Sequence, residues 1–215
     1  MVSSGQLLAY VRRCSRAFER VDDYPLADRA LRPLFTAHRP NTDHASVLAK
    51  TVALNGLYRA GVLDIYRMAA HIHRNGRQLD HLLAAGDPRA VALVRWGHRI
   101  KKRRGSEFGF YSFATKYCHW HQPDQYPMYD SYVVVALKTV LRSLDQRDLL
   151  RGADLRDFST FRRMVAAAKQ GVGWKRHGYK GFDQALWIMG KVIEHEIGAS
   201  VLAAVRPIPH GLRRR

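Results

Sequence analysis

Residues 108–137, FGFYSFATKYCHWHQPDQYPMYDSYVVVAL, hold the densest cluster of reactive side chains in the sequence. Asp130 stands directly before an apolar run, at the position of a helix N-cap. Backbone N–H groups would hold such a carboxylate rigidly, so it could stabilise an oxocarbenium-like sugar or activate a water molecule. Capping of the helix explains the same residue without any chemistry, and both interpretations stay open.

Lys116 is the second candidate catalytic residue in this segment. It shares a helical face with Phe113 and Trp120, at spacings of three and four residues, which predicts a partly buried side chain. A lysine that is desolvated near other cations has a lowered pKa and can attack a sugar carbon as a neutral amine. The alternative is a lysine that binds phosphate.

Aromatic side chains are interleaved with these two residues, and some could stack on a base extruded from a duplex. Later in the chain, Asp183 and Trp187 are one helical turn apart and could offer a carboxylate beside a stacking surface. The alternative for that pair is an acid at a helix start followed by a core tryptophan. The candidate base-pocket residues are Trp187, Asp183, Tyr117, Trp120, His119 and Tyr129.

Cysteine and histidine also cluster in this segment, at Cys118, His119 and His121, with a further pair at His71 and His73. Structural zinc sites need four ligands in paired blocks, and the sequence has no CxxC or HxxxH block. We therefore expect no metal, and we expect these histidines to line a pocket or contact phosphate.

The charge of the chain indicates a polyanionic partner. Lys and Arg number 36 against 18 Asp and Glu, a net charge of +18, and nucleic acid is the commonest partner of such proteins. An anionic membrane surface and an arginine-rich composition without function are the alternatives. Two basic turns supply the candidate DNA contacts, which are Arg99, Lys101, Lys102, Arg103, Arg104, Lys175, Arg176 and Lys180.

The sequence carries no sign of export or of a membrane span. Arg12, Arg13 and Arg16 fall where a signal peptide needs an apolar run, and no stretch approaches about 18 consecutive apolar residues. Cys14 and Cys118 are too few for a disulfide framework and fit a reducing cytosol. We expect a cytoplasmic protein.

Helical periodicity positions these residues and predicts an all-α fold, a compact helical bundle. Helices are expected after Ser3-Ser4, from 41–43 to Gly61, over 63–74 with Gly76 as a stop, from Asp87-Pro88 through Trp96, over 111–121, over 132–144, over 158–168 and from Phe182 to Ile193. We expect a single domain over 1–215, with N-terminal helices over 1–44, a core over 45–197 and a basic tail over 198–215.

The stretch YSFATKYCHWHQPDQYPMYDSYV, with LNGLYRAGVLDIYRMAAHI before it and FDQALWIMGK after it, resembles a group of bacterial proteins. These have the fold of 8-oxoguanine DNA glycosylase, in the helix-hairpin-helix DNA glycosylase superfamily. The similarity spans about residues 45–195. It implies that HRIKKRRGSEFGF, residues 98–110, takes the place of the DNA-gripping hairpin and Asp130 that of the catalytic aspartate. It also implies a monomer that binds double-stranded DNA without a cofactor, in a bacterial nucleoid.

The sequence departs from that family at the lysine. Members with lyase activity carry their nucleophilic lysine further ahead of the aspartate than Lys116, and Tyr111 stands five residues before Lys116. No clean G-x-G hairpin signature is present either. Lys116 is therefore either a Schiff-base nucleophile or a residue of the base pocket, with Asp130 directing water. Whether the chain also has AP-lyase activity stays open.

The resemblance implies a DNA N-glycosylase that flips a damaged or hypermodified base and leaves an abasic site. Some relatives with this fold act in phage defence, so the base could be an oxidised purine or a glucosylated hydroxymethylcytosine of phage DNA. The alternative function is a non-enzymatic basic helical protein that binds DNA or RNA. A third reading is an RNA-directed enzyme or toxin.

Overall fold

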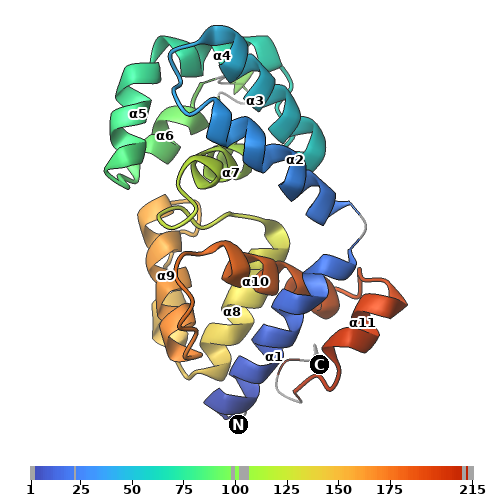
Figure 1. Cartoon of the computed structure of the whole chain (residues 1–215). Coiled ribbons are helices and arrows are strands. Elements are labelled where there is room, and N and C mark those ends of the chain that lie inside the picture. Colours follow the sequence, from blue (N-terminus) through green and yellow to red (C-terminus); the bar gives the residue numbers. More distant parts are fainter. Residues whose placement is uncertain (1–2, 22, 98–99, 102–106, 210–211, 213–215) are drawn as a thin grey trace. The chain divides into compact units, whose positions relative to one another are not determined.

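The computed structural model describes residues 3–21, 23–97, 100–101, 107–209 and 212. Helices dominate these residues, which confirms the predicted helical class (Figure 1). The α-helices are α1 (Ser4–Ala17), α2 (Tyr24–Ala37), α3 (His44–Tyr58), α4 (Ile65–Arg74), α5 (Gly76–Ala84), α6 (Arg89–Arg95), α7 (Tyr111–His121), α8 (Ser131–Ser143), α9 (Phe158–Gly171), α10 (Lys180–Ile193) and α11 (Ala199–Val205). Short 3-10 turns lie at η1 (Phe18–Arg20) and η2 (Arg147–Leu150).

The chain divides into two compact units. Unit 1 comprises residues 1–25 and 127–215, and unit 2 comprises residues 26–126. The candidate residues of the sequence are thereby distributed over both: Asp130, Asp183 and Trp187 belong to unit 1, and Lys116 belongs to unit 2.

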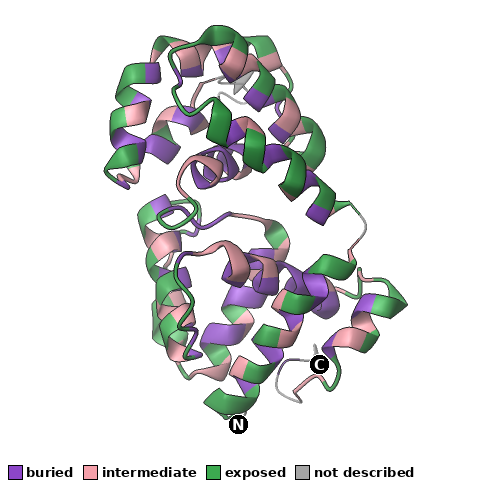
Figure 2. Ribbon diagram, in the orientation of Figure 1, coloured by how far each residue is buried: buried purple, intermediate pink, exposed green. Residues whose placement is uncertain are grey.

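Unit 1 is built around α10, which packs against α8 on one side and α1 on another. Its residues from Phe182 to Ile193 are mostly buried, as the purple colour along α10 shows (Figure 2). At Gly190 the helices approach so closely that a Cβ would lie 2.1 Å from the carbonyl oxygen of Tyr132 in α8. The α8–α10 contact is therefore a contact between backbones, which only glycine permits.

Unit 2 surrounds α7, which contacts α6 and α3. Phe113, Tyr117 and Cys118 in α7 are fully buried. Before α7, two very short strands, β1 (Ile100–Lys101) and β2 (Glu107–Phe108), pair antiparallel with Ile100 opposite Phe108. The sequence predicted a basic turn here without any strand, so this small ribbon is an addition to the all-α expectation.

Local signals in the sequence placed several helix ends correctly. The Ser3 side chain accepts a hydrogen bond from the Gln6 N–H in a capping box, and Asp43 caps α3. The bounds of α7 are those predicted, residues 111–121. Asp130 caps α8 as expected.

The helix predicted over 63–74 does end at Arg74, but the role given to Gly76 was wrong, and α3 ends earlier than predicted. Gly76 does not stop a helix but begins α5, because the absence of a Cβ lets it lie against the backbone of Asn41, where a Cβ would be 2.1 Å from the carbonyl oxygen. α3 ends before Gly61, with Arg59 in the left-handed conformation as its C-cap.

The segment expected as a basic tail, 198–215, contains a further helix, α11, which packs on α1. The Arg13 guanidinium in α1 donates hydrogen bonds to the carbonyl oxygens of Val205 and Pro207, at 3.3 and 2.8 Å. Among the described helices, none has both the length and the apolar character required to cross a membrane.

We predict that Gly190→Ala destabilises the protein by about 1–3 kcal/mol or more, because the new methyl group would overlap the Tyr132 carbonyl. Urea unfolding would measure the loss. Gly56→Ala is the matched control: Gly56 lies in α3 with open space around its Cβ position, so alanine there should be neutral or stabilise by about 1 kcal/mol. Equal stability of the two variants would contradict the close approach of α8 and α10.

Candidate functional site

Asp130 is held at the N-terminus of α8. Its Oδ1 accepts a hydrogen bond from the Tyr132 N–H at 3.0 Å, and its side chain is half-buried. For Asp130 the donor is the N–H two residues later, whereas the other aspartate N-caps of the described helices accept from the N–H three residues later. These bonds join Asp43 to Ser46, Asp64 to Arg67 and Asp157 to Thr160. The positive end of the α8 dipole lies at this carboxylate.

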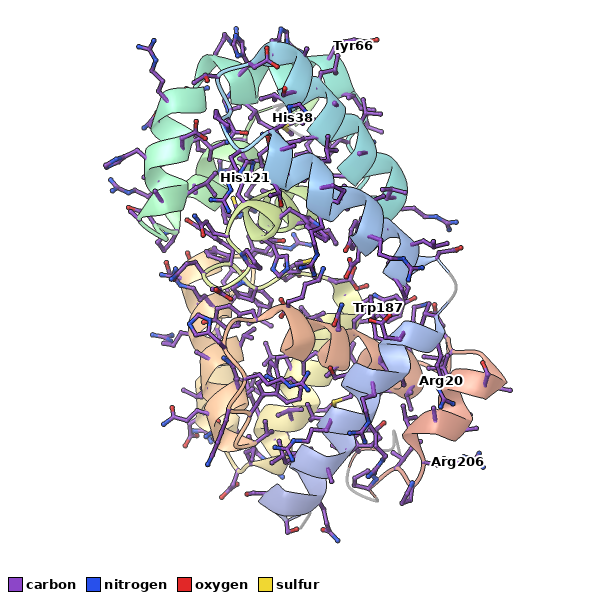
Figure 3. All side chains as sticks on the ribbon, in the orientation of Figure 1. Arg20, His38, Tyr66, His121, Trp187 and Arg206 are labelled. Atoms are coloured by element: carbon purple, nitrogen blue, oxygen red, sulfur yellow. The ribbon has the colours of Figure 1, made fainter. Side chains whose placement is uncertain are left out.

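An aromatic group lies beside the start of α8 in unit 1. Trp187, labelled in Figure 3, belongs to α10. Its ring centroid lies 6.2 Å from that of Tyr132, 4.5 Å from that of Tyr24 and 6.0 Å from that of Phe18. Trp187 is 9% exposed and therefore almost entirely buried. The structure thus brings the Trp187 ring close to Tyr132, whose N–H bonds Asp130.

The side chain of Lys191 lies against this aromatic group. The Lys191 Nζ lies 4.8 Å from the Tyr132 ring centroid and 5.0 Å from that of Trp187. The Tyr132 hydroxyl donates a hydrogen bond to Glu196, and this bond, with burial as a smaller cause, raises the pKa of Tyr132 to about 12. Sequence reasoning missed Lys191 and Glu196, although Lys191 follows Trp187 by four residues and so shares its helical face.

Asp183 is buried in unit 1 and fixes the loop that leads to Asp130. Its Oδ2 accepts a hydrogen bond from the Met128 N–H at 3.0 Å. Burial raises the pKa of Asp183 well above its usual range, while the Met128 bond and the charges of Lys180 and Lys169 act in the opposite direction. At 1% exposure, Asp183 supports the loop from within the unit. We therefore interpret it as a positioning residue for the loop before Asp130.

Tyr129, the residue before Asp130, packs its ring edge-on against Phe161 of α9, with the centroids 5.4 Å apart. The side chain is half-buried. Together with the Asp183–Met128 bond, this contact restrains the backbone on the N-terminal side of Asp130.

Lys116 lies in α7 of unit 2 and is 4% exposed, more deeply buried than the half-buried side chain predicted from its spacing. Its Nζ donates a hydrogen bond to the Ser112 hydroxyl at 2.6 Å and lies 6.0 Å from the Tyr58 ring centroid. The Tyr58 hydroxyl in turn donates to Asp28 at 2.5 Å. The Lys116 side chain is thus buried between the Ser112 hydroxyl of α7 and the Tyr58 ring of α3.

The other base-pocket candidates of α7 pack inside unit 2. Tyr117 is fully buried and donates a hydrogen bond to the Asn41 side chain at 2.6 Å. His119 is fully buried, with Nδ1 2.7 Å from the Tyr126 carbonyl oxygen. Trp120 is half-buried, and its ring centroid lies 6.1 Å from that of Phe35. These contacts favour a core role for Tyr117 and His119, while stacking on a base by Trp120 stays a prediction.

A second buried lysine in unit 2 had no signal in the sequence. Lys50 is fully buried, and its Nζ donates hydrogen bonds to the His38 and Pro40 carbonyl oxygens and to the Asn41 side chain, at 2.8, 3.2 and 2.8 Å. Burial lowers the pKa of Lys50 to about 8. Burial also lowers the pKa of the nearby His121 at the end of α7 (Figure 3), and the Lys50 charge adds to this.

The predicted DNA contacts are only partly described. Arg99, Lys102, Arg103 and Arg104 lie outside the described residues, and Lys101 belongs to β1. Lys175 and Arg176 are exposed in the segment between α9 and α10, where they line a cavity together with residues of α1. Lys180 is the first residue of α10 and is half-buried.

Within the part of the chain that the structure describes, no three His, Cys, Asp or Glu side chains are grouped closely enough to hold a metal ion. His44 and His73 stack with their ring centroids 4.9 Å apart. Cys118 is fully buried, and burial raises the pKa of its thiol. The cysteine is thus a poor nucleophile or ligand in this environment.

Comparison with known proteins gives a family match and one relative. The model of the family HI_0787_N, described as an N-terminal domain, matches residues 7–125, more than half of the chain. An uncharacterized protein of Haemophilus influenzae is 33% identical over 139 residues, which are 65% of this chain and 63% of that protein. The chain therefore spans somewhat less than two thirds of that relative. No solved structure is significantly similar.

We predict that the stability of the wild-type protein declines, relative to that of Asp183→Asn, as pH rises from 5 to 8. The folded-state pKa of Asp183 is raised, so its ionisation costs stability above the ordinary aspartate pKa of about 3.9. Asparagine removes this cost and keeps an acceptor for the Met128 N–H. Urea unfolding at both pH values would measure the difference.

Asp183→Ala is the companion variant, because it removes the acceptor as well. It should destabilise the protein by about 1–3 kcal/mol at pH 5, where the asparagine variant is close to the wild type. A wild-type advantage over Asp183→Asn that grows toward pH 8 would contradict the raised pKa.

Proposed function

We propose that this chain, which belongs to the HI_0787_N family, is a DNA N-glycosylase. It would extrude a damaged or hypermodified base from duplex DNA and hydrolyse its glycosidic bond, leaving an abasic site. The observation that carries this proposal is the position of the Asp130 carboxylate at the N-terminus of α8. It accepts a hydrogen bond from the backbone N–H of Tyr132, whose ring lies beside that of Trp187. The helix-hairpin-helix arrangement of the glycosylase superfamily, to which the sequence shows a resemblance, is part of the same proposal.

Asp130 would act on the sugar of the extruded nucleotide. A water molecule adds its oxygen to the anomeric carbon, and the carboxylate accepts the proton that this water loses. The bond between sugar and base breaks with its electron pair on the base, which takes up a proton from solvent. The negative carboxylate also stabilises the positive charge that develops on the sugar ring. The cap bond to the Tyr132 N–H holds the carboxylate in one place for both roles.

The aromatic group gives the base a surface to pack against. Trp187 is 9% exposed, and the rings of Tyr132 and Tyr24 lie beside it. Aromatic faces accept any base by stacking, which gives affinity without strict sequence preference. The net charge of +18 supplies nonspecific affinity for duplex DNA, which falls steeply with salt.

A non-enzymatic DNA-binding or RNA-binding protein is the second candidate function, and one observation favours it. Asp130 is a helix cap, a structural role that Asp43, Asp64 and Asp157 fill in other helices. The two functions make opposite predictions for the Asp130 carboxylate, because a cap needs only an acceptor oxygen whereas hydrolysis needs a base.

We predict that Asp130→Asn lowers base release by about 10²–10⁴-fold while DNA affinity is retained or slightly increased. Asparagine is also a good N-cap, so the helix should remain. The assay incubates the protein with duplexes that carry 8-oxoguanine, uracil, alkylated purines or glucosylated hydroxymethylcytosine, and reveals abasic sites with hot alkali.

Asp157→Asn is the matched control, since Asp157 caps α9 in the same unit and is exposed. It should leave base release unchanged. If the wild type cleaves none of these substrates, or if both asparagine variants behave alike, the chain is a binding protein and the proposal is wrong.

Lys116 has a separate prediction, because its role as nucleophile or pocket residue is open. If Lys116 forms a Schiff base, borohydride should trap a covalent complex of the wild type with DNA, and Lys116→Ala should lose it. Lys138→Ala, which changes an exposed lysine of α8, is the control and should keep trapping. Base release by the wild type without any trapped complex would exclude the Schiff base and leave hydrolysis by water.

A further inference from the structure

Unit 1 contains a basic cavity that is separate from the residues around Asp130. Its volume is about 280 Å³, and it is lined by Arg12, Ser15, Arg16, Trp174, Lys175 and Arg176. Four of these six side chains are cationic. Sequence reasoning identified Lys175 and Arg176 as DNA contacts but gave Arg12 and Arg16 no binding role.

Helical geometry and one loop explain why these cations converge. Arg12, Ser15 and Arg16 are spaced by three and four residues on α1, so they lie on one face of that helix. Lys175 and Arg176 come from the segment between α9 and α10. Neither α1 nor the segment 172–179 contains an acidic residue. In the described part of the chain, none of the four cations forms an ion pair with a carboxylate.

The loop side of the cavity is held in place by Trp174. The backbone N–H of Trp174 donates a hydrogen bond to the Lys169 carbonyl oxygen at 3.0 Å. The Trp174 ring centroid lies 5.8 Å from that of Phe182 in α10. Gly181 fits between the loop and α1, because a Cβ there would lie 3.4 Å from the Trp174 ring and 3.7 Å from the Ser15 hydroxyl. The Arg176 guanidinium lies 5.8 Å from the Trp174 ring centroid.

The lining residues have the charge and the hydrogen-bond donors that suit a phosphate group. Guanidinium groups present several N–H donors in a plane that matches phosphate oxygens, and Ser15 adds a hydroxyl donor. Pockets for small organic ligands are mostly apolar and usually occupy about 300–1,000 Å³, whereas this cavity is slightly smaller and chiefly cationic. A single phosphate group that belongs to a larger polyanion fits both its size and its charge.

We propose that this cavity, formed by α1 and the loop before α10, binds one backbone phosphate of duplex DNA. The inference rests on the proposed function only for DNA as the partner, because the cavity itself requires nothing more than a phosphate. Bound there, the phosphate anchors the strand on unit 1, the unit that also carries Asp130. The cavity is a binding element and takes no part in bond cleavage.

The test compares two double variants with the same change in charge. Arg12→Gln with Arg176→Gln removes two cations from the cavity, whereas Arg142→Gln with Arg163→Gln removes two exposed arginines elsewhere in unit 1. Affinity for an unmodified DNA duplex is measured over a range of salt concentrations. For the cavity variant, the plot of the logarithm of the binding constant against the logarithm of the salt concentration should be less steep than for the wild type. The slope should differ by about 0.9, the value for one phosphate contact. The control should keep the wild-type slope.

Three outcomes would overturn the proposal: no binding of the duplex by the wild type, equal slopes in the two double variants, or a wild-type slope in the cavity variant. Inorganic phosphate provides a further arm. If it raises the melting temperature of the wild type but not of the cavity variant while DNA affinity is equal in both, the cavity binds a small phosphate instead of DNA.

The base-release assay separates this proposal from the proposed function. The cavity variant should still release base at a DNA concentration that saturates the enzyme, because Asp130 is unchanged. If the wild type releases no base but the cavity variant loses DNA affinity as expected, the phosphate site stands and the glycosylase proposal falls. If base release depends on Asp130 but the cavity variant binds DNA normally, the reverse holds.

Discussion

The backbone contact between α8 and α10 is the constraint on which the candidate site depends. Because Gly190 has no side chain, α10 lies directly against the Tyr132 carbonyl. That proximity puts Trp187, three residues earlier on α10, beside the Tyr132 ring. Further back on the same helix, Asp183 reaches the Met128 N–H in the loop before Asp130. One helix thus supplies the aromatic wall of the site and restrains the loop that carries its carboxylate.

Each unit buries an ionisable side chain that holds a loop by hydrogen bonds to main-chain atoms. In unit 1 Asp183 accepts from the Met128 N–H, and in unit 2 Lys50 donates to the carbonyl oxygens of His38 and Pro40. Burial raises the pKa of Asp183 and lowers the pKa of Lys50, and both shifts favour the neutral form of the side chain. The energetic cost of desolvating these two groups is therefore offset by their hydrogen bonds to the loops. The main-chain groups in these bonds lie outside the helices.

The sequence was informative where structure is local and uninformative where it depends on distant contacts. Ser3 and Asp130 were correct as caps, because capping involves only the next few residues. Gly76 was misread as a stop, because its role is set by the distant Asn41 backbone. Lys50 could not be found at all, since its partners are loop carbonyls and its own neighbours look like an ordinary helix. Arg12 was visible as a charge, but only the fold places it in the same cavity as Arg176.

The burial of Lys116 bears on the proposed mechanism. Hydrolysis by water requires a carboxylate, a surface for the base and a grip on the strand, and Asp130, Trp187 and the basic cavity of α1 all belong to unit 1. A Schiff base would instead require Lys116, whose ammonium is buried in unit 2 and bonded to Ser112. An amine must lose its proton and reach the sugar to attack it. Within the proposed function we therefore favour hydrolysis by water, which does not require the buried Lys116 to reach the sugar.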